Sequence, residues 1–166
     1  MKRLLIVFIV ILACHPFYGQ EVKSLGRAEF YWLLNGACVS GDVLAVRILL
    51  DAGADPSGPT DFKEFVKKQY NGAEPDWHLC CATWNGHTEV VSLLLKAGAD
   101  PNLAVSEGYT ALTIAASKGY TEIARILLDN GADKKYKQGS RTALDIAEAC
   151  HHLETADVIR SHEKQK

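Results

Sequence analysis

The chain has 166 residues, of which 48% are hydrophobic and 23% are charged, and its formal net charge at pH 7 is −2. These values are ordinary for one soluble domain. Binding to nucleic acid depends on a basic surface, so the slightly acidic balance excludes nucleic acid as the expected partner.

Residues 1–19 have the pattern of a signal peptide. Two basic residues precede an uncharged apolar run, residues 4–13, which is too short to span a bilayer comfortably. Two cleavage sites fit the sequence. One lies before Cys14, as in a bacterial lipoprotein, and would leave a lipid anchor there; the other follows Gly19. With either site, and with no Asn-x-Ser/Thr sequon in the sequence, we expect an exported protein of the bacterial periplasm or cell envelope.

The remainder of the chain repeats one motif. Its clearest copy, Asn85–Asn102, places apolar residues at helical spacing before Gly98, a residue suited to a left-handed helix end. The equivalent Gly131 follows 33 positions later, whereas Gly53 precedes Gly98 by 45 positions, so an insertion separates the first two copies. A second motif, such as Thr110–Ala116, precedes each copy. Each unit is therefore predicted to be two short helices and a turn.

The strings TALTIAA, GYTE and LLLKAGADPN resemble those of ankyrin repeats, and a period of 33 residues is specific to that family. The resemblance implies an all-α fold for residues 20–166: an ankyrin-repeat solenoid of about four helix-turn-helix units, with turn-like fingers projecting at one side. The predicted units are about residues 29–56, 75–107, 108–139 and 140–166.

The first unit carries the aromatic residues Phe30, Tyr31 and Trp32, which we expect to close the exposed end of the stack. Trp32 and Trp77 occupy the position at which the family places a buried threonine, so both are predicted to lie in the core.

The insertion, residues 57–74, is predicted to be an amphipathic helix. Asp61 and Glu64 have the spacing of a capping box, and four apolar residues follow helical spacing. The inserted helix either enlarges the partner-binding side or only covers the neighbouring finger, and the sequence leaves both interpretations open. The apolar residues are Phe62, Phe65, Val66 and Tyr70.

After the predicted signal peptide four cysteines remain: Cys38, Cys80, Cys81 and Cys150. The resemblance places Cys38 and Cys81 in neighbouring repeats, which stack about 8–10 Å apart, beyond ordinary disulfide reach. We therefore expect free thiols that act as small apolar fillers.

The sequence contains no recognisable catalytic constellation, cofactor motif or metal-ligand spacing; the pair His151 and His152 points in two directions on a helix. The resemblance instead assigns partner contact to the finger tips and to the exposed ends of the first helices. The corresponding residues are Asp76, Trp84, Asn85, Glu107, Tyr109, Ser117, Lys118, Tyr136 and Arg141. Trp84 is either a binding anchor, as indoles often are, or packs on the inserted helix.

These observations predict an exported, non-enzymatic platform that binds another protein whose identity the sequence does not give. One interpretation is an immunity or inhibitor protein for a toxin or an enzyme. The alternative is an accessory factor for an envelope enzyme, such as one that removes peroxide. An enzyme is the least favoured class.

Overall fold

The computed structural model describes residues 27–57 and 78–162. Within these ranges it contains eight α-helices, one turn of 3-10 helix and one two-stranded hairpin. The helices are α3 (Arg27–Ser40), α4 (Val43–Asp51), α6 (His78–Trp84), α7 (Thr88–Lys96), α8 (Ala111–Lys118), α9 (Thr121–Asp129), α10 (Ala143–Ala149) and α11 (Leu153–Ser161). The 3-10 turn is η1 (Ser106–Gly108), and the strands are β1 (Lys137–Gln138) and β2 (Arg141–Thr142).

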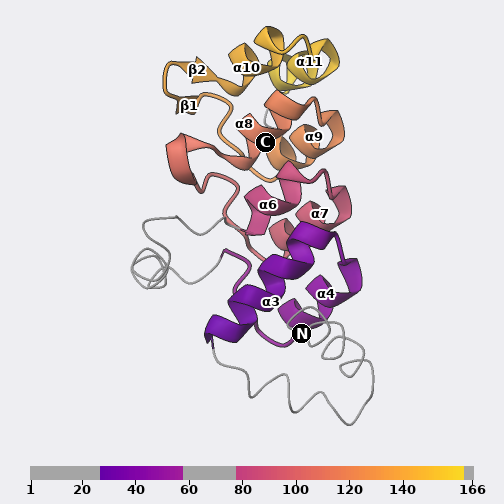
Figure 1. The fold of residues 1–166 in the computed structure, drawn as a ribbon. Coiled ribbons are helices and arrows are strands. Elements are labelled where there is room, and N and C mark those ends of the chain that lie inside the picture. Colours follow the sequence, from indigo (N-terminus) through magenta and orange to yellow (C-terminus); the bar gives the residue numbers. More distant parts are fainter. Residues whose placement is uncertain (1–26, 58–77, 163–166) are drawn as a thin grey trace.

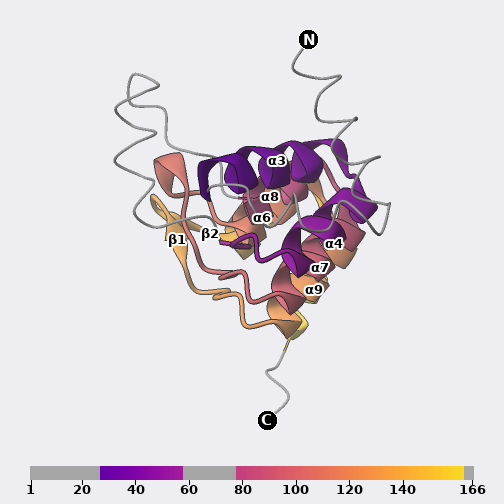
Figure 2. The same ribbon diagram turned by 90° about the horizontal axis from the view of Figure 1, so that it is seen from below.

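Consecutive helices form antiparallel pairs, and the pairs stack side by side so that the helices make two rows (Figure 1). In the first row α3 contacts α6, α6 contacts α8 and α8 contacts α10; in the second row α4, α7, α9 and α11 contact one another in the same order. Seen from below, the β1–β2 hairpin projects at the side of the stack away from the second row (Figure 2). The predicted all-α stack of helix pairs is confirmed.

Threonines start two of the first-row helices. The side chain of Thr110 accepts a hydrogen bond from the backbone of Thr113, and the side chain of Thr113 accepts one from the backbone of Thr110. Thr142 and Asp145 form the same capping box at the start of α10. Each box satisfies two backbone N–H groups that the first turn of a helix leaves unpaired.

Each second-row helix buries one apolar stripe, and α4, α7 and α9 end in the same kind of glycine turn. In α9 the stripe is followed by Gly131, whose φ of 89° is readily adopted only by glycine. The next backbone N–H, of Ala132, then donates to the carbonyl of Leu127 at 3.0 Å. Burying a leucine of this kind stabilises the fold by about 1.5–3 kcal/mol, so the stripe contributes substantially to the packing of the stack. The buried stripe of α9 consists of Ile123, Ala124, Leu127 and Leu128.

Polar side chains also join successive units. The amide of Asn102 donates to the carbonyl of Gly131 at 3.1 Å and accepts from the backbone N–H of Asp133 at 2.7 Å. Between the last two units, the hydroxyls of Thr121 and Thr155 are 2.9 Å apart. Because the amide of Asn102 binds both a donor and an acceptor of the next turn, it helps to fix the distance between successive turns. The contact between Thr121 and Thr155 does the same for two successive helices.

Two expectations for side chains were wrong. Trp32 was expected in the core but is 44% exposed, because α3 begins at Arg27 and continues through this position, whereas threonines at the equivalent position start α8 and α10. Tyr31 is buried instead. Cys150 is exposed and is therefore no core filler, although Cys38, Cys80 and Cys81 are buried.

Several predictions fall outside the described residues: the signal peptide over residues 1–19 with its Cys14, the inserted helix apart from Ser57, and the core position of Trp77. Ser57 is described, and its hydroxyl accepts a hydrogen bond from the backbone N–H of Asp100 at 3.2 Å.

Candidate functional site

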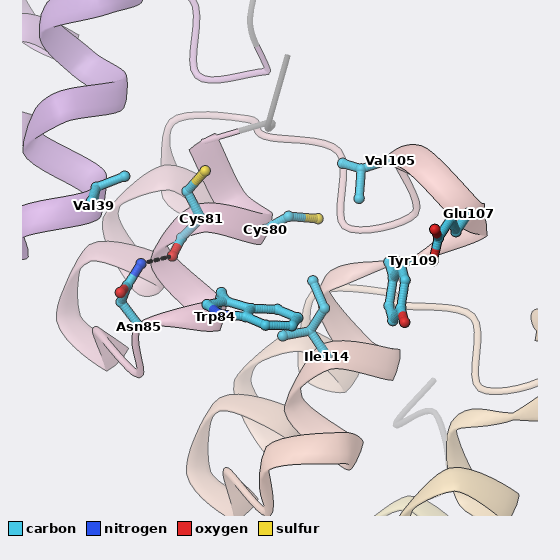
Figure 3. Close-up of a pocket in the computed structure, with 9 residues that line it drawn as sticks. All are labelled: Val39, Cys80, Cys81, Trp84, Asn85, Val105, Glu107, Tyr109 and Ile114. Carbon is cyan, nitrogen blue, oxygen red and sulfur yellow. Dashed lines mark hydrogen bonds between the residues drawn. The ribbon is translucent and has the colours of Figure 1, made fainter. Parts of the chain in front are cut away.

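The inner face of the stack, formed by the first-row helices and the fingers, contains a cavity of about 330 Å³. α6 provides one wall, α8 and the end of α3 contribute to it, and the finger of residues 103–109 completes it (Figure 3). Apolar and aromatic side chains predominate in the lining. The lining residues are Val39, Cys80, Cys81, Trp84, Asn85, Val105, Glu107, Tyr109 and Ile114.

Trp84 ends α6 at the mouth of the cavity and is 50% exposed. Figure 3 shows its indole in a row with Ile114 and the ring of Tyr109. The ammonium of Lys118 lies over the indole, with Nζ 4.2 Å from the ring centroid, a distance at which a cation and a π face attract each other. Lys118 therefore holds a positive charge next to the cavity.

Asn85 is positioned by its own helix. Its side-chain amide donates to the carbonyl of Cys81 at 2.8 Å, the hydrogen bond drawn in Figure 3. The same carbonyl also accepts the backbone N–H of Asn85 at 3.2 Å, so the side chain reinforces the last turn of α6. The side chain of Asn85 therefore lies against the end of α6, and its exposed part borders the cavity.

The finger is a closed turn. The backbone N–H of Val105 donates to the carbonyl of Tyr109 at 2.8 Å, and that of Gly108 donates to the carbonyl of Val105 at 3.0 Å. Glu107, at its tip, adopts a φ of 61°, which a non-glycine residue reaches only at a cost in free energy. The turn is further supported by the next finger, because β1 contacts η1.

The structure brings together five of the nine residues predicted to contact a partner. Four line the cavity and Lys118 lies over one of them. The four lining residues are Trp84, Asn85, Glu107 and Tyr109.

The other four predicted residues lie elsewhere. Ser117 is half-buried, and its carbonyl accepts a hydrogen bond from Nε2 of His152 at 3.1 Å. The hydroxyl of Tyr136 approaches Gly108, so this residue supports the finger from the next unit. Arg141 is exposed on β2, away from the cavity lining, and Asp76 lies outside the described residues.

Sequence reasoning missed the other five lining residues, although the repeat could have identified one of them. Val39 stands two positions before Gly41, as Trp84 stands two positions before Gly86 and Ser117 two positions before Gly119. The same offset therefore predicts Val39 on the inner face. The contributions of Val105 and Cys80 depend on how the finger folds back over α6, which the repeat does not encode.

The described residues offer little reactive chemistry at the cavity. Burial raises the pKa of the neighbouring Cys38 thiol to about 12, with Cys81 adding to the effect, so Cys38 stays protonated at neutral pH. Within residues 27–57 and 78–162, no three histidine, cysteine, aspartate or glutamate side chains gather as a metal ion would require. None of the helices in this part of the chain has both the length and the hydropathy of a membrane span.

Comparison with known proteins agrees with the architecture. No curated protein matches the chain. The family described as ankyrin repeats matches residues 77–166 as three copies, which is more than half of the sequence. The matched segment contains the last three helix pairs, and the pair α3 and α4 stacks on them in the same manner. The chain belongs to the ankyrin-repeat proteins.

Proposed function

We propose that this chain is an exported, non-enzymatic platform that holds another protein at the inner-face cavity and thereby blocks the activity of a toxin or an enzyme. Ankyrin repeats are typically non-catalytic modules that bind proteins. The observation that carries the proposal for this chain is the half-exposed indole of Trp84 at the mouth of an apolar cavity.

Covering the exposed indole of Trp84 with apolar groups of a partner would favour binding. Burial of apolar area stabilises a complex by about 25 cal/mol per Å², and tryptophan and tyrosine are enriched among the residues that dominate binding. Trp84 and Tyr109 supply both residue types to one cavity. The cavity is also built on helices and on a hydrogen-bonded turn, so binding would order little of the chain.

We expect the double substitution Trp84→Ala and Tyr109→Ala to lower partner capture at least about tenfold, because each removes a large apolar contact at the centre of the interface. The full chain would be cross-linked to the envelope fraction, and the captured proteins identified and quantified. The midpoint of thermal unfolding should change by only a few degrees, since both side chains are partly exposed.

Leu153→Ala provides the matched control. Leu153 is 67% exposed at the far end of the stack, so its substitution also removes an exposed apolar side chain but leaves the cavity intact. Capture by this variant should equal that of the wild type. Equal capture by the double variant would contradict the proposal.

The activity of the captured partner distinguishes an inhibitor from an accessory factor. If the chain is an inhibitor or an immunity protein, adding it to the purified partner should abolish the partner's activity, and the double variant should not. Undiminished or increased activity would favour the alternative, an accessory factor for an envelope enzyme.

Export is supported by the basic start and apolar run of the first 19 residues. A reporter that is active only outside the cytoplasm, fused after Glu21, should be active. A reporter trapped in the cytoplasm would contradict export while leaving the binding proposal intact. Replacing Cys14 with serine tests the lipid anchor: the lipoprotein alternative requires the chain to leave the membrane fraction.

A further inference from the structure

We propose that the partner presents a large apolar residue beside an acidic one: the apolar side chain enters the cavity next to Trp84 and Tyr109, and the carboxylate pairs with Lys118. The inference rests on the proposed function, because it describes what the cavity holds.

The apolar half of the inference follows from the lining. Aliphatic, aromatic and thiol-bearing side chains make up most of the lining, and the amide of Asn85 already donates to the carbonyl of Cys81. At about 330 Å³ the cavity is near the lower end of the range for small-molecule sites, which suits one or two side chains of a protein better than a cofactor. An apolar side chain entering it would replace water that finds few hydrogen-bond partners.

The acidic half follows from the charges around the mouth. Lys118 holds its ammonium over the indole of Trp84, and none of the ion pairs among the described residues includes it. The same is true of Lys137 and Arg141 on the adjacent hairpin. A carboxylate of the partner would therefore meet a cation that forms no ion pair with any carboxylate of the described residues.

The acidic side chain beside the two hairpin cations, Asp145, is already hydrogen-bonded within its own capping box. The carboxylate of Asp145 is held by Thr142, from both the backbone N–H and the hydroxyl at 2.7 Å. Lys137 and Arg141 lie close enough to lower the pKa of Asp145, after the larger effect of those two hydrogen bonds. Glu107 lines the cavity on the finger, whereas Lys118 is the last residue of α8. Glu107 and Lys118 thus place opposite charges on different elements of the rim. An acidic residue of the partner would be attracted to the side of Lys118.

Selection from a displayed library of random peptides, with the full chain as bait, tests the inference. Enriched peptides should contain Phe, Leu, Met or Trp within two positions of Asp or Glu. The dissociation constant of one selected peptide would then be measured by fluorescence anisotropy. Lys118→Glu should weaken binding at least about tenfold and Lys118→Arg should largely retain it, because like charges repel and either cation pairs with a carboxylate.

Lys96→Glu is the matched control, since it makes the same charge reversal at the exposed last residue of α7, which does not line the cavity: binding should be unchanged. Replacing the peptide's acidic residue by its amide should abolish the dependence on Lys118, which a structural role of Lys118 would not produce. Circular dichroism of each variant checks that the fold is retained.

The outcomes separate the two proposals. Peptides that bind the Trp84→Ala and Tyr109→Ala variant as well as the wild type would overturn the proposed function together with this inference. Binding that needs both aromatic residues but is indifferent to Lys118→Glu, or enrichment of basic peptides that depend on Glu107, would overturn this inference alone. So would a library that enriches no peptide at all, or self-association of the chain abolished by Trp84→Ala, which would make a second copy the occupant.

Discussion

Replacing Gly119 with alanine should destabilise this protein by about 2–3 kcal/mol. Gly119 ends α8 with a φ of 71°, where an alanine costs about 1–2 kcal/mol. A Cβ there would also lie 2.6 Å from Nδ1 of His152, in the next unit, so the imidazole would have to move. That ring donates from Nε2 to the carbonyl of Ser117, a hydrogen bond worth about 0.5–1.5 kcal/mol that the movement would weaken.

Urea unfolding at neutral pH measures this cost, and two further variants divide it. Combining Gly119→Ala with His152→Ala removes the collision, so the double variant should be destabilised by less than the sum of the two single changes. Gly36→Ala is the matched control, because Gly36 lies within α3 and no atom lies within 4 Å of the added Cβ. It should stabilise the protein by about 0.5–1 kcal/mol, since alanine favours a helix over glycine. Losses that simply add in the double variant would show that His152 does not constrain this position.

The same contact recurs between the first two described units. A Cβ on Gly41 would lie 2.6 Å from Nδ1 of His87, and Nε2 of His87 donates to the carbonyl of Val39 at 3.1 Å. The repeat predicts a glycine at Gly41 and Gly119 because a helix must end there. It does not predict the contact, since the ring that occupies the space belongs to the next unit along the stack.

The helix pairs were predictable because their signals are local. Each capping threonine, apolar stripe and turn glycine acts within about ten residues, and the period repeats the signal often enough to place it. Trp32 was mispredicted because α3 continues through a position where a repeat of ordinary length would begin its helix. The local signal was absent there, and the family pattern gave the wrong answer.

The candidate site was predictable only in part, for a related reason. Trp84 and Tyr109 could be placed on the inner face from the resemblance to ankyrin repeats. That they share one cavity depends on the closed turn between Val105 and Tyr109, which brings the finger back over α6. Whether this cavity binds a partner stays a prediction.

The second large effect concerns pH and the buried His78. Its side chain is 0% exposed, and neither ring nitrogen has a hydrogen-bond partner among residues 27–57 and 78–162. The nearest aromatic neighbour among the described residues is Tyr31, whose ring centroid lies 5.0 Å away. Burial lowers the pKa of His78 from 6.5 to about 4, because the charged imidazolium loses its hydration inside the stack.

The pKa of His78 is lower in the folded chain than in the unfolded one. Its protonation therefore does not affect stability well above pH 6.5, but lowers the free energy of unfolding as the pH falls from 6.5 to about 4. Below pH 4 both states are protonated and the loss stops growing. A difference of about 2.5 in pKa, at about 1.4 kcal/mol for each unit, corresponds to a loss of about 3 kcal/mol. His78→Phe keeps a ring against Tyr31 and cannot take up the proton, so its stability should exceed that of the wild type by a margin that widens over this range. Urea unfolding of both proteins from pH 7.5 to pH 4 gives that margin at each pH, and the carboxylates common to both cancel in the comparison. A constant margin would mean that His78 remains as easily protonated in the fold as in the unfolded chain, and that water reaches the interface between α3 and α6.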